Sequence, residues 1–165
     1  MQYRWGLTPW QCGDLLVTLT DVLSPFHLAI PVRDLQAALM FYEQVLGCGR
    51  GRQSADWVDL NFYGHQLVLH QVAAPQGPSA SNPVDGEQVP VPHFGVILPW
   101  PDFEALAGRL ASQGTVFEIP PTTRFAGRVG EQRTFFLRDP SGNCLEFKAF
   151  RDPSRLFSAD LEAYR

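Results

Sequence analysis

The sequence predicts an α+β fold built from two copies of one βαβββ unit. Three observations support this prediction. Alternating, β-rich runs occupy similar places in both halves of the 165-residue chain, one helix-period stretch follows the first run of each half, and a segment rich in Pro and Gly separates the halves. Because such a unit cannot bury its sheet alone, we expect the two copies to pair, and the face that they share can become a cavity.

The first unit is expected at about 24–73. Its first strand, FHLAIPV at 26–32, is interrupted late by Pro31, as in a strand that ends there or lies at an edge. Asp34 is a good N-cap for a helix through about Leu46, whose apolar residues follow one helical stripe, and Gly47 is a good stop. The remaining strands are predicted at 56–63 and 66–72, with a possible short strand near 48–53.

The second unit is expected at about 91–150, after a linker at 74–90. A strand at 93–100 runs into a helix capped by Asp102 and stopped by Gly114. The later strands are predicted at 115–119, 133–138 and 144–150, with a loop at 120–131. Outside the two units, residues 1–23 are interpreted as an N-terminal extension and 151–165 as a tail with a short helix.

Composition narrows the class of ligand. A net charge of −4, from 13 basic and 17 acidic residues, argues against nucleic acid or an anionic membrane as a partner. No run approaches the roughly 18 apolar residues of a membrane span. The odd count of three cysteines without CxxC spacing indicates neither a disulfide framework nor a zinc-thiolate site, and favours a reducing cytoplasm. We therefore expect a cytoplasmic protein with a small-molecule ligand.

One acidic residue stands out in the last predicted strand. The turn DPSGN at 139–143 leads into CLEFKAF, where Glu146 sits among residues that otherwise favour burial. A carboxylate in so apolar a strand must be paired, bound to a metal, or exposed. It has two predicted explanations here: a metal ligand, or an ion pair with Lys148 or an arginine.

Two histidines occupy matching places in the repeat. His27 and His93 stand near the starts of the two first strands, so a pseudo-symmetric pairing of the units would bring both imidazoles to the cavity that holds Glu146. Two His and one carboxylate leave positions open for substrate and oxygen, which suits non-haem Fe(II). Mn(II), Ni(II), Co(II) or Zn(II) can use the same ligands. The alternative for each histidine is an ordinary core residue.

The order βαβββ-βαβββ, the opening FHLAIPVRDLQAALMFYEQVLG, the strand HFGVIL and the ending DPSGNCLEFK resemble the vicinal oxygen chelate superfamily. That superfamily includes glyoxalase I, extradiol dioxygenases, fosfomycin-resistance transferases, epimerases and metal-free bleomycin-binding proteins. The resemblance covers about residues 25–150. It implies a pseudo-symmetric, cup-shaped mixed β-sheet with the helices outside, and a metal at the centre of the cup.

The family's ligand positions fall on His27, Val68, His93 and Glu146 in this sequence. Valine cannot coordinate a metal, and this departure disfavours glyoxalase I activity. The remaining set is similar to that of extradiol dioxygenases, whose acid/base histidine has a possible counterpart in His70. Those enzymes often carry a Tyr hydroxyl on the penultimate strand, where this chain has Phe135 and Phe136.

The sequence thus favours a metal-dependent, dioxygenase-like enzyme in which His27, His93 and Glu146 hold the metal and His70 moves a proton. The alternatives are a glyoxalase-like lyase or isomerase and a metal-free binding protein. A homodimer is expected, with the two units paired either within one chain or across the dimer. Arg124, Arg128 and Lys148 are candidates for an anion-holding rim, against the alternative of a solvated loop.

Overall fold

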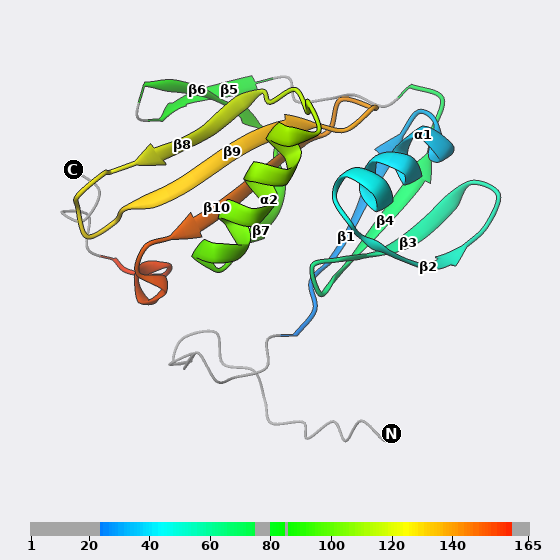
Figure 1. The fold of residues 1–165 in the computed structure, drawn as a ribbon. Helices are drawn as coiled ribbons and strands as arrows, with labels where there is room; N and C mark the ends of the chain where they lie inside the picture. The colour runs from blue at the N-terminus through cyan, green and yellow to red at the C-terminus, as the bar shows by residue number, and fades with distance from the viewer. Residues whose placement is uncertain (1–23, 75–79, 85, 160–165) are drawn as a thin grey trace, which may run out of the picture.

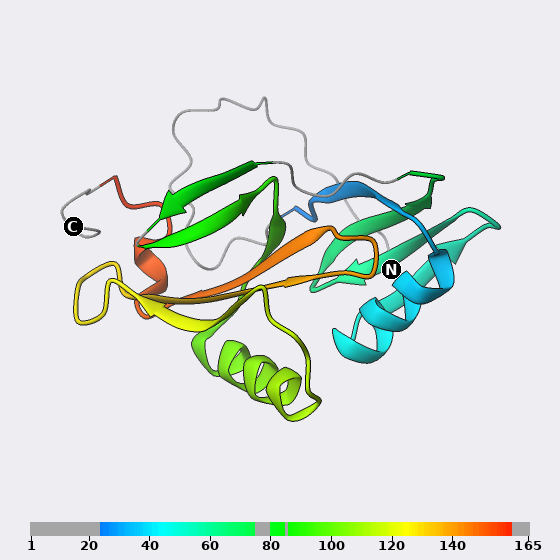
Figure 2. The same cartoon turned by 90° about the horizontal axis from the view of Figure 1, so that it is seen from above.

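The computed structural model of the protein describes residues 24–74, 80–84 and 86–159. Two four-stranded mixed sheets lie side by side, with strand orders β1-β4-β3-β2 and β7-β10-β9-β8 (Figure 1). In each sheet the first and last strands of the unit run parallel and the other neighbours run antiparallel. The two helices lie on one side of the sheets (Figure 2). The predicted α+β fold of two repeated units with external helices is confirmed.

Module one holds the first sheet and its helix. Its helix is capped by Asp34, whose side chain accepts hydrogen bonds from the backbone N–H groups of residues 36 and 37. The last helical turn widens to a π-helix before Gly47, which ends it with φ +80°. The short strand expected near 48–53 is present. The elements are β1 His27–Val32, α1 Leu35–Met40, the π-helical turn Phe41–Val45, β2 Gly49–Gln53, β3 Trp57–Phe62 and β4 His65–Gln71.

Module two repeats this order as β7 Phe94–Ile97, α2 Trp100–Ser112, β8 Ile119–Arg124, β9 Gln132–Arg138 and β10 Cys144–Phe150. The helix begins two residues before the predicted cap Asp102, because Pro101 is well suited to a first helical turn. The strand predicted at 115–119 lies later in the chain, at Ile119–Arg124, where a loop was expected. An edge position and a register shift after Ile119 let this strand accommodate Pro120 and Pro121.

The segment expected as a linker contains a β-hairpin. Strands β5 Ala80–Val84 and β6 Glu87–Val91 pair with each other, apart from the two main sheets. The hairpin lies on the side of module two opposite α2 (Figure 2). Val89 packs there in a buried cluster with Ile119, Phe136 and Cys144. The hairpin therefore covers the face of the second sheet that the helix leaves open.

The turn at 139–143, between β9 and β10, forms hydrogen bonds to module one. Asp139 is buried and accepts hydrogen bonds from the N–H groups of Ser141 and Asn143 and from the Tyr42 hydroxyl of module one. The Asn143 amide in turn donates to the Pro31 carbonyl. Burial, with the charge of Asp139 second, raises the pKa of Tyr42 well above its usual range, so the phenol stays a donor. One apolar core runs through both modules beneath these contacts.

The C-terminal tail is described as far as residue 159. This part holds one 3-10 turn, Pro153–Arg155, which the Asp152 side chain caps. The predicted extension at 1–23 and the tail beyond residue 159 lie outside the described residues. Within the described ranges no helix has the length and apolar character needed to cross a membrane.

Candidate metal centre

Module two brings His93 and Glu146 together. Glu146 lies on β10 beside Gly95 of the parallel strand β7, and His93 directly precedes that strand. The His93 Nε2 atom is 3.2 Å from Glu146 Oε2. The proximity predicted from the repeat is therefore seen for these two residues.

A backbone carbonyl sets the protonation of the His93 ring. Nδ1 lies 2.6 Å from the carbonyl oxygen of Pro90, at the end of the hairpin. Because a carbonyl only accepts, Nδ1 must donate, and in the neutral imidazole the lone pair is then on Nε2. The edge of the ring also packs against Phe136, with centroids 5.2 Å apart. The ring is thus held with its potential ligand atom toward Glu146.

Glu146 has two further partners. The hydroxyl of Thr134, fully buried on β9, donates to Oε1 at 2.6 Å, and the Lys148 ammonium lies 3.3 Å from the same oxygen. Burial alone would raise the pKa of Glu146, but the hydrogen bond from His93, the charge of Lys148 and the Thr134 hydroxyl lower it overall. The same hydrogen bond raises the pKa of His93. The pair therefore favours its ionised form when no metal is bound.

Gly95 allows β7 to approach Glu146 unusually closely. A Cβ atom at residue 95 would lie 1.6 Å from the carbonyl oxygen of Glu146. Real Cβ atoms do not come so near to a backbone oxygen, so only glycine fits without moving a strand. The position of the carboxylate thus depends on a residue that has no side chain.

These groups open onto a pocket of about 260 Å³ along β7. Its wall consists of residues 93–97 together with Glu146 and Lys148. Of the three cations expected at a rim, Lys148 lines this pocket, whereas Arg124 is buried and donates to the Val84 carbonyl of the hairpin. The rim prediction therefore applies to Lys148 and fails for Arg124.

His27 and His70 lie on strands of module one and not in the pocket beside Glu146. His27 is exposed at the start of β1, with Nδ1 2.8 Å from the Gln66 side-chain oxygen, and His70 is exposed near the end of β4. Val68, opposite Ala29 on the same strand pair, is buried. Among the described residues no group of three or more His, Cys, Asp or Glu side chains is placed to hold a metal ion. Within the described residues of one chain, His93 and Glu146 converge, and His27, the third predicted ligand, lies on another strand.

The donor set itself fits a divalent metal. An imidazole Nε2 oriented through its other nitrogen, and a carboxylate held by a hydroxyl, are the arrangement found around metal ligands in proteins. A third protein donor would have to approach from the open side of the pocket. His93 and Glu146 could then hold the metal without leaving their present partners Pro90 and Thr134.

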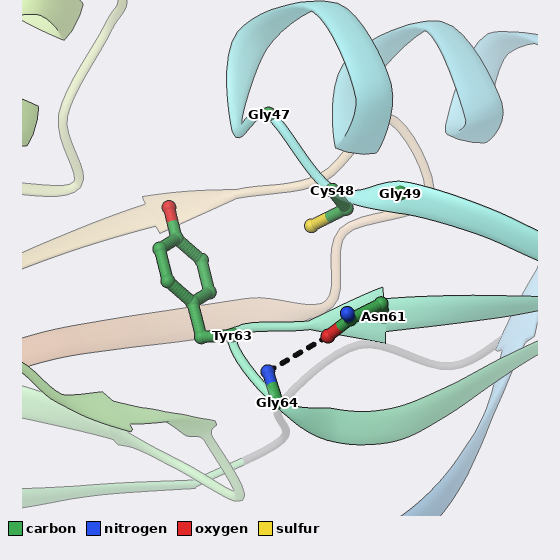
Figure 3. A pocket seen from close by; sticks show the side chains of 6 residues that line it. All are labelled: Gly47, Cys48, Gly49, Asn61, Tyr63 and Gly64. Atoms are coloured by element: carbon green, nitrogen blue, oxygen red, sulfur yellow. Dashed lines mark hydrogen bonds between the residues drawn. The ribbon is translucent and has the colours of Figure 1, made fainter. Parts of the chain in front are cut away.

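A second pocket, of about 220 Å³, lies at the turn between β3 and β4 (Figure 3). Its wall holds several glycines, and the Asn61 side chain accepts from the Gly64 N–H. Burial raises the pKa of the Cys48 thiol to about 12, and that of Tyr63, whose hydroxyl donates to the Leu46 carbonyl, also to about 12. Neither group is an activated nucleophile, so this pocket is the weaker candidate.

Sequence reasoning missed Thr134, Gly95 and the Pro90 carbonyl. Thr134 could have been found, because it lies two residues from Phe136 on β9 and therefore shares the face of Glu146. Gly95 is an ordinary interruption of a strand pattern in the sequence. A backbone carbonyl leaves no trace in residue type at all.

Comparison with known proteins places this geometry in context. The profile of the Glyoxalase/Bleomycin resistance protein/Dioxygenase superfamily matches residues 24–147. A crystal structure of a glyoxalase/bleomycin resistance protein/dioxygenase from Alicyclobacillus acidocaldarius is similar with a TM-score of 0.66 and 36% identity, covering 81% of this chain and 96% of that one.

Two curated proteins are also similar in sequence. Virulence protein STM3117 of Salmonella typhimurium is 27% identical over 124 residues, 75% of this chain and 82% of that protein. The glyoxalase domain-containing protein RDO1 of Mycosarcoma maydis is 25% identical over 151 residues, 89% of this chain and 78% of that protein. These names describe a shared domain and do not specify one reaction.

Proposed function

The chain belongs to the glyoxalase/bleomycin resistance protein/dioxygenase superfamily, and within it we propose a metal-dependent, dioxygenase-like enzyme. Its substrate is a small molecule that chelates the metal through two oxygens. The observation that carries the proposal is the 3.2 Å approach of His93 Nε2 to Glu146 Oε2 at an open pocket, with Nδ1 occupied by the Pro90 carbonyl. A catalytic metal site needs oriented protein donors, usually three, beside an open position, and His93 and Glu146 supply two of them.

Iron(II) bound here would supply a Lewis acid and a redox partner for dioxygen, and Mn(II), Ni(II), Co(II) or Zn(II) are alternative occupants. The chain's own residues orient the ligands and confine the substrate. The His93 ring packs against Phe136 of β9, which forms a buried apolar cluster with Val89 of the hairpin, so one side of the ring faces apolar groups. His70 remains the proposed proton carrier, because it shares the strand face of Val68 and is exposed to solvent.

The third ligand in this proposal is His27 of a second copy. Strands β1 and β7 are both edge strands, each with a single neighbour among the described residues. A two-fold axis would set β1 of one copy beside the β7 edge of the other and bring an exposed His27 to the open pocket. The proposed enzyme is therefore a homodimer, and its place in the cell is the cytoplasm.

Mixed dimers test this arrangement. His27→Ala and Glu146→Ala subunits each lack one ligand, but a dimer containing one of each keeps a complete site if His27 acts across the interface. We expect co-refolded mixed dimers to bind one metal ion per two chains, and neither variant alone to bind any. Mixed dimers that stay empty while the wild type fills would show that the site is built within one chain.

A metal-free binding protein is the second candidate. The observation in its favour is that Glu146 already has three partners, His93, Thr134 and Lys148, and needs no metal to satisfy its charge. A lyase or isomerase reaction is a further alternative within the metal-dependent class. It differs from the favoured proposal in consuming no dioxygen.

Elemental mass spectrometry on protein purified without air separates these proposals. We expect about one metal ion per site in the wild type, none in Glu146→Ala, and the wild-type content in Glu118→Ala, which removes an exposed carboxylate paired with Arg138. Oxygen uptake is then measured across a panel of catechols and enediols. Wild-type protein that cannot be loaded with Fe(II) would overturn the metal-dependent proposal, and loaded protein that turns over substrate without oxygen would favour the lyase or isomerase.

A further inference from the structure

Lys148 is the only lysine in the sequence; the other twelve basic residues are arginines. It follows Glu146 by two positions on β10, so both side chains emerge from the same face of the strand. Its side chain is 27% exposed and lines the pocket of the candidate metal centre. The one free-amine side chain of the protein thus lies beside the proposed metal ligands.

The present partner of Lys148 changes when a metal is bound. Without metal, the ammonium lies 3.3 Å from Glu146 Oε1. Under the proposed function the negative charge of Glu146 is directed to a divalent ion, and the His ligands are neutral. The metal and Lys148 together then exceed Glu146 by two positive charges, and among the described residues that line the pocket no other carries charge.

On the β7 side, the neighbour of Lys148 is apolar; on the β9 side it is Thr134. Ile97 lies opposite Lys148 in register and is 47% exposed, so it gives the pocket a hydrophobic wall beside the ammonium. Apolar walls lower the local dielectric and strengthen the attraction of an unpaired cation for an anion. The backbones of Glu146 and Lys148 are about 6–7 Å apart along the strand, and the flexible lysine stem lets the ammonium either reach Oε1, 3.3 Å away, or turn outward along the pocket. An anionic group paired with the outward-turned ammonium then lies about one aromatic ring from the metal.

We propose that Lys148 selects substrates that carry a carboxylate in addition to the two oxygens that chelate the metal. The inference rests on the proposed metal-dependent function and narrows its substrate class to amphipathic carboxylates. The carboxylate pairs with the ammonium, and the carbon skeleton lies against Ile97. A lysine suits this task because its compact charge sits on a flexible stem that can follow ligands of different length.

Catechol and 3,4-dihydroxybenzoate form a matched pair of probes, because they share the chelating diol and differ in one carboxylate. Binding is measured by anaerobic calorimetry on protein whose metal content has been determined. We expect the wild type to bind 3,4-dihydroxybenzoate at least about tenfold more tightly than catechol. Lys148→Met should lose this preference while it still takes up metal and still binds catechol. Lys148→Arg should keep most of the preference.

Amine labelling gives a second readout. Acetylation by an activated ester can modify Lys148 and the chain's α-amino group, and mass spectrometry separates the two. We expect 3,4-dihydroxybenzoate to slow the acetylation of Lys148 several-fold in metal-loaded protein, with the α-amino group as internal reference, and catechol to slow it much less.

The outcomes distinguish two failures. Protein that takes up no metal would overturn the proposed function and this inference with it. Metal-loaded protein that binds neither probe, binds both equally, or keeps its preference in Lys148→Met would overturn the inference alone. Equal protection of Lys148 by both probes would likewise show that the lysine does not recognise the carboxylate.

Discussion

Equivalent positions of the two modules hold opposite kinds of side chain. In module two, Glu146 on the last strand lies beside Gly95 on the first; in module one the corresponding pair is Val68 and Ala29. Val68 is buried between Ala29 and Asp59 of the neighbouring strands, whereas Glu146 faces an open pocket. The same backbone pattern therefore holds a buried apolar side chain in one module and a polar site in the other.

Module one does have a carboxylate near this position, but on the adjacent strand. Asp59 of β3 lies opposite Val68, where module two has Phe136 opposite Glu146. Asp59 pairs with Arg52 at 2.8 Å and does not meet a histidine in the described structure. In module two the acid is on the last strand, next to the first strand, and it contacts the histidine that precedes the first strand. In module one the acid is one strand farther away and pairs with an arginine.

The largest expected effect comes from giving module two the Cβ atom that module one has. Gly95→Ala places this atom against the Glu146 carbonyl, so β7 or β10 must shift. We expect a loss of about 3 kcal/mol or more in unfolding free energy by urea titration, together with loss of metal binding. The matched control, Ala29→Gly in module one, should cost only about 0.5–1 kcal/mol. If Gly95→Ala keeps the wild-type stability, β7 and β10 have room for a Cβ atom at residue 95, which contradicts the close contact of these strands.

The next largest effect comes from giving module one a carboxylate. Val68→Glu buries a charge without a partner, and we expect metal-free protein to lose about 3 kcal/mol of stability in thermal or urea unfolding. Val68→Gln, with the same shape and no charge, is the control. If β4 faces the shared metal site, added Zn(II) should raise the melting temperature more in Val68→Glu than in Val68→Gln. Equal shifts would place Val68 away from the metal.

Removing the hydroxyl that holds Glu146 should have a smaller effect. Thr134→Val keeps the shape of the side chain but removes the 2.6 Å hydrogen bond to Oε1. We expect metal affinity to fall about 10–100-fold and metal-free stability to fall by about 1 kcal/mol, as measured by competition with a chelator and by urea titration. The control Thr123→Val changes an exposed residue of β8 and should leave metal affinity and stability unchanged. Unaltered metal affinity in Thr134→Val would contradict this positioning role.

The smallest effect concerns pH. The pKa of His93 is raised above its ordinary value of 6.5, so its contribution to stability is full below pH 6.5 and is lost as the pH rises through the folded-state pKa. The pKa of Glu146 is lowered below its ordinary value of 4.5, so its contribution is full above pH 4.5 and is lost as the pH falls through the folded-state pKa. The pair should therefore stabilise metal-free protein most between about pH 4.5 and 6.5, by about 1 kcal/mol or less. Urea titrations of wild type and His93→Gln across pH 4–8 measure the difference, and parallel pH profiles would show that the pair contributes nothing.

Much of the fold follows from local pattern in the sequence. The turn residues before Cys144 and the alternation after it predicted the final strand correctly, and the register of Gly64 with Gly142 paired Val68 with Glu146 as equivalent positions. The hairpin was missed because its prolines are typical of a linker. Pro83 and Pro90 are tolerated in a hairpin that pairs with no main sheet, so composition alone misleads there.

The site was predictable where it depends on side-chain type. His93 and Glu146 were singled out because two histidines at matching strand starts and a carboxylate on the last strand indicate metal chemistry. Their proximity, 3.2 Å, is seen in the structure, and their role as metal ligands stays a prediction. The assignment of His27 and His70 as metal ligand and proton carrier stays a prediction, because residue spacing does not determine whether modules pair within or between chains. The close approach at Gly95 and the Pro90 carbonyl depend on backbone geometry, which no side-chain pattern encodes.

The turn at 139–143 has a consequence for the order in which the protein folds. Its partners in module one, Pro31, Arg33 and Tyr42, precede it by 112, 108 and 97 positions respectively. During synthesis, module one leaves the ribosome long before the acceptor of the Tyr42 hydroxyl exists. The buried Tyr42 hydroxyl gains its acceptor only after residue 139 has emerged, so docking of the modules is a late, long-range step.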